Sequence, residues 1–136
     1  MGNLLAMICG ILLANGQPAL DTNVGEEKIF GDVEKGIAVG SVAQFSEHLG
    51  PQVYLQLPES EGAHYSANQA FYVLDLFLRR HKIAGVKFTT FGTSESNPYA
   101  TGNVAYIVKG VRLNAQVYVA LARRGDRWVI THLSIY

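Results

Sequence analysis

The sequence predicts one α+β domain in which helices come first and an antiparallel sheet follows. Apolar residues recur at three- and four-residue spacings up to about residue 81, whereas strand-like runs separated by turn signals follow Gly85. Because helices do not alternate with strands along the chain, a parallel α/β sheet is not expected. The 136 residues are 49% hydrophobic and 16% charged, which is enough apolar material for one buried core.

The N-terminal segment resembles an export signal. Residues 4–14 are mostly apolar, and small residues follow at Ala14 and Gly16, as signal peptidase requires. The run is shorter than the roughly 20 residues of a membrane-spanning helix, so we expect no permanent membrane span. We predict a signal peptide over residues 1–16, a linker over 17–25, one domain over 26–136, and a periplasmic or secreted protein. No basic residue precedes the run, so a helix of the mature protein stays the alternative.

The first half of the domain contains the predicted helices. Glu26 to Ile37 has the apolar spacing of an amphipathic helix, and Gly40 ends it. Ser41 then caps a shorter predicted helix, which buries Val42, Phe45 and Leu49 and ends at Gly50-Pro51. His48 lies at the end of this second predicted helix.

One strand and the most regular helix follow. Residues 53–57 alternate with the period of a strand, which Pro58 ends, and a polar turn containing His64 comes next. Ser66 and Gln69 have the spacing of a capping box. The third helix is therefore predicted from Ala67 to His81, with Ala70, Val73, Leu74, Phe77 and Leu78 on its buried face.

The second half of the domain predicts four strands. They span residues 86–91, 99–109, 111–122 and 127–136, and turn signals at 95–98, Gly110 and 124–126 separate them. The simplest architecture is a bent antiparallel sheet packed on the third helix, with the first two helices closing one end.

Both faces of the late strands carry apolar residues. Two sets compete for the buried face of the last strand, namely Val129, Leu133 and Ile135 against Trp128, Ile130 and Tyr136. The turn at Gly125 leaves the register open by one residue, which would exchange the two faces. Because a sheet with one solvated face should alternate cleanly, we predict a homodimer through the second face.

Charge is unevenly distributed along the chain. Residues 1–61 hold eight carboxylates and two bases, while the remainder holds nine bases and three carboxylates. The bases are dispersed except at Arg79 to Lys82, where the end of a helix explains them, so we expect no nucleic-acid partner. A single cysteine, Cys9, excludes a disulfide framework and a cysteine-based zinc site.

Three segments resemble a family of small exported bacterial proteins known as a domain of unknown function within the nuclear transport factor 2-like superfamily. They are residues 92–102, 65–70 and 115–118, and the run from Pro98 to Gly102 is the most specific. The resemblance covers about Glu26 to Tyr136. It implies a cone in which a bent antiparallel sheet cradles a long helix, a pocket between the two, and frequent dimers. It implies no established activity.

Candidate catalytic residues are few. Relatives resembling ketosteroid isomerases or dehydratases place an Asp or an Asp–His pair inside the cone. Here the late strands carry no carboxylate in their cores, which leaves His132 in the last strand and Asp75 on the third helix as weak candidates. Histidines at metal-ligand spacings are missing from the sequence, so we expect neither a metal nor a cofactor.

Tyrosine is the most suggestive residue type for ligand binding, because its ring stacks and its hydroxyl orients. Five of the seven are candidates for lining a pocket: Tyr65, Tyr72, Tyr99, Tyr106 and Tyr118. Three hypotheses follow. The preferred one is a non-catalytic exported domain that binds a small apolar or amphipathic ligand or a protein partner. The others are a small isomerase, dehydratase or hydrolase using His132 with a tyrosine or Asp75, and a monomeric adaptor with an open sheet face.

Overall fold

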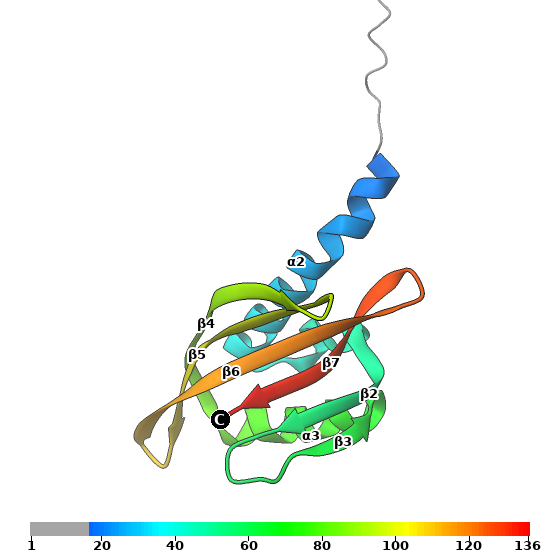
Figure 1. Ribbon diagram of the computed structural model, residues 1–136. Helices are drawn as coiled ribbons and strands as arrows, with labels where there is room; N and C mark the ends of the chain where they lie inside the picture. Colours follow the sequence, from blue (N-terminus) through cyan, green and yellow to red (C-terminus); the bar gives the residue numbers. More distant parts are fainter. Residues whose placement is uncertain (1–16) are drawn as a thin grey trace, which may run out of the picture.

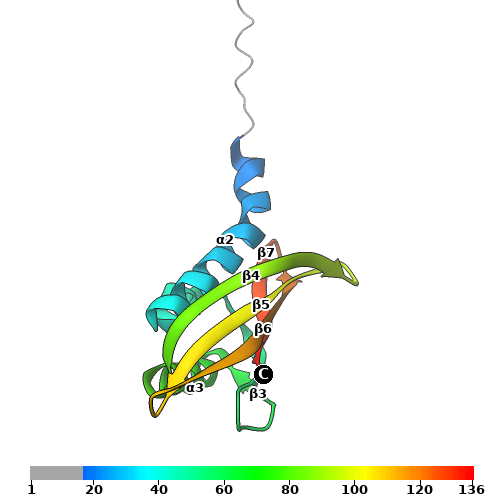
Figure 2. The same cartoon turned by 90° about the vertical axis from the view of Figure 1, so that its left-hand side faces the viewer.

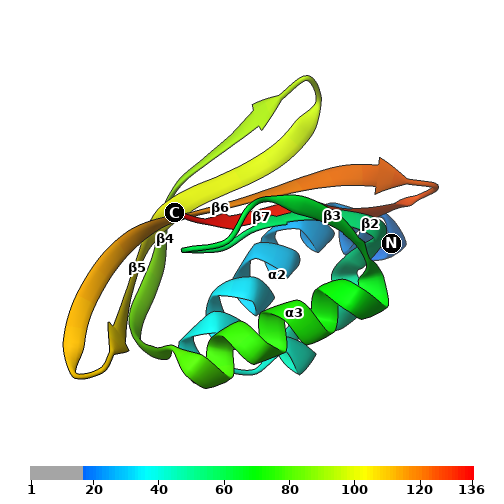
Figure 3. The ribbon, with the colours of Figure 1, turned by 90° about the horizontal axis from the view of Figure 1, so that it is seen from below.

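The computed structural model describes residues 17–136 and confirms the α+β prediction. Two helices, α2 (Gln17–Val39) and α3 (Ala67–Arg80), pack on a bent six-stranded sheet (Figure 1). Figure 3 shows both helices against one face of the sheet, which we call the inner face; the opposite one is the outer face. The predicted signal peptide, residues 1–16, lies outside the described residues.

Helix α2 begins earlier than predicted, so residues 17–25, expected as a linker, are helical. Pro18 falls in the first turn, where its missing N–H has no intrahelical partner. The predicted end is confirmed, because Gly40 adopts φ +75° and its N–H donates to the carbonyl of Ile37. Helix α2 runs beside β4 (Lys82–Ser94) (Figure 2).

The short second helix was predicted wrongly. Two 3₁₀ turns take its place, η1 (Val42–Gln44) and η2 (Ser46–His48), and the side chain of Ser41 makes no capping bond. Leu49, Gly50 and Pro51 already belong to strand β2 (Leu49–Gln56). Short 3₁₀ turns are common as connectors, and here they bury Val42 and Phe45 before the chain enters β2.

Strand β3 (Ala63–Ser66) was not predicted. It pairs antiparallel with β2 and places His64, expected in a polar turn, opposite Tyr54. The capping box of α3 is confirmed: Ser66 Oγ accepts from the Gln69 N–H, and Gln69 Oε1 accepts from the Ser66 N–H. Helix α3 has 14 residues and α2 has 23, so the helix expected to be the long one is the shorter.

Three hairpins build the rest of the sheet, as predicted. Strands β4, β5 (Asn97–Val108), β6 (Val111–Arg124) and β7 (Arg127–Ile135) pair antiparallel in sequence order. The full order is β3-β2-β7-β6-β5-β4. β2 and β7 run parallel, which differs from the wholly antiparallel sheet that was expected.

A β-bulge settles which residues of β7 face inward. Ala120 pairs with His132 and Leu121 pairs with Ile130, so Thr131 is an extra residue in the strand. The bulge shifts the phase by one residue. As a result Ile130, Leu133 and Ile135 share the inner face, opposite Leu121, Val119 and Val117, although the two predicted sets had placed them apart.

The core lies between the inner face and the two helices. Val33 and Ile37 of α2 meet Phe45, which is fully buried and approaches so closely that a Cβ on Gly36 would lie 2.5 Å from its ring. Leu74, Phe77 and Leu78 of α3 cover the part of the core near β2. Within residues 17–136, none of the helices is long and apolar enough to cross a membrane.

Candidate functional site

A groove of about 450 Å³ opens between α2 and the edge strand β4. Its lining comes from the side of α2 that faces β4, and from the part of the β4–β5 hairpin that passes over it. The side chains that give it chemical character are Glu26, Glu27, Phe30, Glu34, Phe88, Phe91 and Tyr99.

Three phenylalanine rings form the apolar part of this groove. The ring centroids of Phe30 and Phe88 lie 6.2 Å apart, those of Phe30 and Phe91 5.8 Å, and those of Phe88 and Phe91 6.2 Å. Phe30 and Phe88 are buried, whereas Phe91 is 60% exposed. An aromatic ring this exposed beside a concave surface indicates a surface that a bound ligand would cover.

Three glutamates of α2 line the groove together with the rings, and the lining holds no lysine or arginine. Glu34 is fixed, because its Oε2 accepts the Phe88 backbone N–H at 2.8 Å. That N–H points away from β5 at the edge of the sheet, so the bond also satisfies a donor that edge strands otherwise leave open. Glu26 and Glu27 lie about two turns earlier on α2 and add negative charge to the same groove.

Tyr99 connects this groove to the outer face of the sheet. It pairs with Gly92 across β5 and β4, and a Cβ on Gly92 would lie 2.6 Å from the Tyr99 hydroxyl oxygen. The Tyr99 side chain therefore passes over Gly92 toward the groove, and a side chain at position 92 would push the Tyr99 ring aside.

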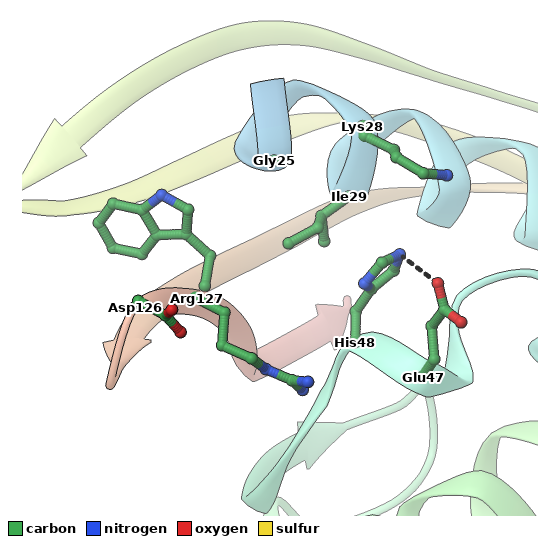
Figure 4. Close-up of a pocket in the computed structure, with 8 residues that line it drawn as sticks. Gly25, Lys28, Ile29, Glu47, His48, Asp126 and Arg127 are labelled. Atoms are coloured by element: carbon green, nitrogen blue, oxygen red, sulfur yellow. Dashed lines mark ion pairs between the residues drawn. The ribbon is translucent and has the colours of Figure 1, made fainter. Parts of the chain in front are cut away.

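A second pocket, of about 500 Å³, lies between α2, η2 and the β6–β7 turn (Figure 4). His48 lines it and forms a short contact with a carboxylate behind it, 2.8 Å from Nε2 to Asp32 Oδ2. Lys28 Nζ also bonds Asp32 Oδ2, at 3.0 Å. Burial opposes ionisation of the Asp32 carboxyl, but its bonds to His48 and Lys28 outweigh that effect and lower the pKa of Asp32.

Five rings cross the outer face of the sheet in one row. In order they belong to β5, β6, β7, β2 and β3, and neighbouring ring centroids lie 4.9 to 6.0 Å apart. We call them the outer row: Tyr99, Tyr118, His132, Tyr54 and His64. The helices cover the opposite face, so they leave the outer row open.

The predicted pocket tyrosines do not converge on one cavity. Tyr106 is buried on the inner face beside Phe77, Tyr72 is 63% exposed on α3, and Tyr65 is partly buried against the core. Tyr99 and Tyr118 lie together in the outer row, with ring centroids 6.0 Å apart. Of the five, only Tyr99 lines either of the two pockets.

The two weak catalytic candidates lie apart. His132 is on the outer face, where its Nε2 is 2.8 Å from Ser134 Oγ, and burial together with nearby His64 lowers its pKa. Asp75 lies on α3 and bonds the exposed Arg79, Oδ2 to Nη2, at 2.6 Å. Because α3 covers the inner face, the sheet stands between the two residues.

Apart from Tyr99, the residues that line the two pockets were not predicted from the sequence. The acidic and apolar positions of α2 were recognised, but nothing local predicted that Phe30 would meet Phe88 and Phe91 on a strand more than 50 residues later. His48 was explained as a helix-end residue, and its bond to Asp32 spans 16 residues. In residues 17–136, His, Cys, Asp and Glu do not gather in any group of three or more able to hold a metal ion.

Comparisons with known proteins agree with the fold. A family model described as a domain of unknown function, DUF4783, matches residues 30–136. Curated protein sequences contain no match to the chain.

Three solved structures illustrate the likeness. A DUF4783 family protein from Bacteroides uniformis is 17% identical, with a TM-score of 0.68 over 77% of this chain and 93% of its own. A designed protein of the nuclear transport factor 2 type is 14% identical, with a TM-score of 0.65 over 84% and 98%. An LEH-like epoxide hydrolase from M. tuberculosis is 14% identical, with a TM-score of 0.61 over 80% and 75%. At these identities the likeness concerns the fold alone.

Proposed function

This chain belongs to the DUF4783 family, a domain of unknown function with the nuclear transport factor 2-like fold, and from that premise we propose that it is a non-catalytic binding domain. Its ligand is amphipathic, with an apolar body and a cationic group, and it binds in the groove between α2 and β4. The sequence predicted an apolar or amphipathic ligand, and the proposal adds that the ligand carries a positive charge.

The observation that carries the proposal is the combination of three glutamates with an exposed aromatic surface. An apolar chain or ring would bury against Phe91 and gain the hydrophobic free energy of that contact. A cation beside the same rings would be attracted both by the aromatic faces and by Glu26, Glu27 and Glu34. An anion would meet three like charges and no base in the lining.

The experiment compares two ligands that differ only in their head group. Isothermal titration calorimetry with dodecyltrimethylammonium and with dodecyl sulfate, both below their micelle concentrations, separates charge from chain length. We expect the cation to bind at least about tenfold more tightly, because one cation–aromatic contact is worth about 1 to 2 kcal/mol. Equal affinity for the two detergents would contradict the proposal.

Matched variants locate the binding. Phe91→Ala removes the exposed ring and should weaken dodecyltrimethylammonium binding by about tenfold. Tyr72→Ala removes a ring of similar exposure from α3, outside the groove, and should change nothing. Glu26→Gln combined with Glu27→Gln should reduce the preference for the cation, whereas Glu59→Gln, a carboxylate outside the groove lining, should leave it unchanged.

We also propose that two copies associate through the outer row. Support comes from its composition: five rings in contact across five strands, on the face that the helices do not cover, form a surface typical of protein interfaces. Export rests on the sequence of residues 1–16 alone and is proposed on that ground.

A further inference from the structure

We propose that the pocket between α2, η2 and the β6–β7 turn is a second and independent site, which takes a small aromatic molecule with an acidic hydroxyl group. His48 receives that hydroxyl. This site lies apart from the α2–β4 groove and shares no lining residue with it.

Two carboxylates orient the imidazole ring of His48. Its Nε2 lies 2.8 Å from Asp32 Oδ2 and 3.7 Å from Glu47 Oε2. A carboxylate can only accept a hydrogen bond, so Nε2 carries a proton. Among the described residues, Nδ1 has no hydrogen-bond partner. In Figure 4 this second nitrogen lies on the side of the ring turned away from Glu47 and toward Arg127.

Asp32 is held in its ionised form by His48 and Lys28, so a negative charge stays beside Nε2 of the imidazole. A ligand hydroxyl can therefore pass its proton to Nδ1 and remain bound as an oxyanion. The imidazolium then stands between two negative groups, the Asp32 carboxylate and the ligand oxygen.

The rest of the pocket lining is partly apolar and partly charged. Trp128 and Ile29 supply apolar walls. A Cβ at Gly25 would lie 3.8 Å from Trp128 Cδ1, so the glycine leaves the space beside the indole open. Lys28 and Arg127 attract an anion, and Glu47 and Asp126 repel it. All four side chains are exposed, so solvent screens both signs of charge and the partly buried His48–Asp32 pair decides the polarity of the site. The volume of about 500 Å³ suits a molecule of one or two rings.

The experiment uses p-nitrophenol, because its phenolate absorbs visible light and its phenol does not. At a pH where free p-nitrophenol is mostly protonated, adding the protein should raise the phenolate absorbance in a saturable way. p-Nitroanisole has the same ring without the hydroxyl proton, and we expect it to bind at least about tenfold more weakly, the value of one charge-assisted hydrogen bond. This comparison uses the unmodified protein, so it does not depend on the folding of any variant.

Two variants test the named residues. His48→Gln should abolish the absorbance change, and Asp32→Asn should weaken binding by about tenfold because the imidazolium loses its partner. Phe91→Ala, which affects only the α2–β4 groove, should leave p-nitrophenol binding intact, so failure of the two proposals can be told apart. Equal binding of p-nitroanisole, or an unchanged absorbance signal with His48→Gln, would overturn the assignment.

Discussion

At the residue scale, the Asp32 side chain links helix α2 to the 3₁₀ turn η2. Its carboxylate joins Lys28, one turn ahead on the same helix, and His48, on a 3₁₀ turn 16 residues later. Because its pKa is lowered in the folded protein, Asp32 adds stability above the ordinary carboxyl pKa, and that stability is lost as the pH falls through the lowered value.

The first prediction concerns the stability that ionised Asp32 adds to the folded protein. Asp32→Asn should lower the free energy of unfolding at pH 7 by roughly 1 to 2 kcal/mol, the range for a partly buried hydrogen bond to a charged group. The loss should shrink in acid, once the pH falls through the lowered pKa of Asp32 and the carboxyl of the unmodified protein also becomes protonated. Urea denaturation at neutral pH and in acid measures it.

Asp75→Asn is the matched control for that experiment. Asp75 also bonds a base, Arg79, but as an (i, i+4) pair whose arginine is exposed. Pairs of this kind contribute only about 0.3 to 0.5 kcal/mol, so its change should be small at both pH values. A pH-independent loss on Asp32→Asn would mean that packing, rather than charge, explains the role of Asp32.

At the scale of single residues, sequence patterns predict bonds that are local. The capping box of Ser66 and Gln69 spans three residues, and the structure contains both of its hydrogen bonds. The bond of Asp32 to His48 and the bond of Glu34 to the Phe88 N–H depend on how distant elements meet. Neither the period of a helix nor the spacing of a motif contains that information.

At the scale of elements, the requirement for glycine at position 102 also depends on how two strands meet. It pairs with Phe88, next to the bulge at Thr89, where β4 and β5 approach closely. A Cβ at Gly102 would overlap the carbonyl oxygen of Lys87 and lie 2.6 Å from Phe88 Cα. Because both atoms belong to the backbone, a side-chain rotation cannot relieve the clash.

The second prediction is therefore that Gly102→Ala destabilises the protein by about 2 to 4 kcal/mol, above the usual range for a surface change. Gly31→Ala on α2 is the control, because a Cβ there meets nothing within 4 Å and alanine favours a helix. Urea denaturation of the two variants should give shifts of opposite sign. Equal urea denaturation midpoints for the two variants would show that β4 and β5 can move apart without loss of stability.

Among the elements, those with strong local signals were predicted and those defined by pairing were not. Helix α3 has a cap and a regular apolar face, and the hairpin turn at Gly110 has a positive φ of 79°. Strand β3 has only four residues and becomes a strand by pairing with β2. The bulge at Thr131 depends on the register with β6, so the two candidate faces of β7 were indistinguishable in the sequence.

At the scale of the whole molecule, the fold class follows from the order of the elements, whereas the grooves do not. The α2–β4 groove exists because a helix from the start of the domain lies along the edge strand β4, which begins after residue 80. Of the five candidate tyrosines, Tyr65 and Tyr106 pack on the core side, whereas Tyr99 and Tyr118 lie in the outer row. Phenylalanine rings, carboxylates and Tyr99 line the groove.

The third prediction concerns association. Native mass spectrometry of the protein purified from its own host should give the mass of a dimer whose chains lack residues 1–16. Tyr118→Asp places a charge within the outer row and should convert the dimer to a monomer, whereas Tyr72→Asp on α3 should not. A monomer at high micromolar concentration would contradict the pairing, and a full-length chain would contradict export.

Tyr99 belongs to two surfaces. Its ring is the last of the outer row, and its side chain also lines the α2–β4 groove. Two copies joined by the outer row would each keep a groove at the flank of the pair. A polymer or membrane surface that displays many cationic groups would then be held at two points, and such bivalent attachment strengthens retention by a factor on the order of a hundred or more. A lone ligand molecule gains no such avidity.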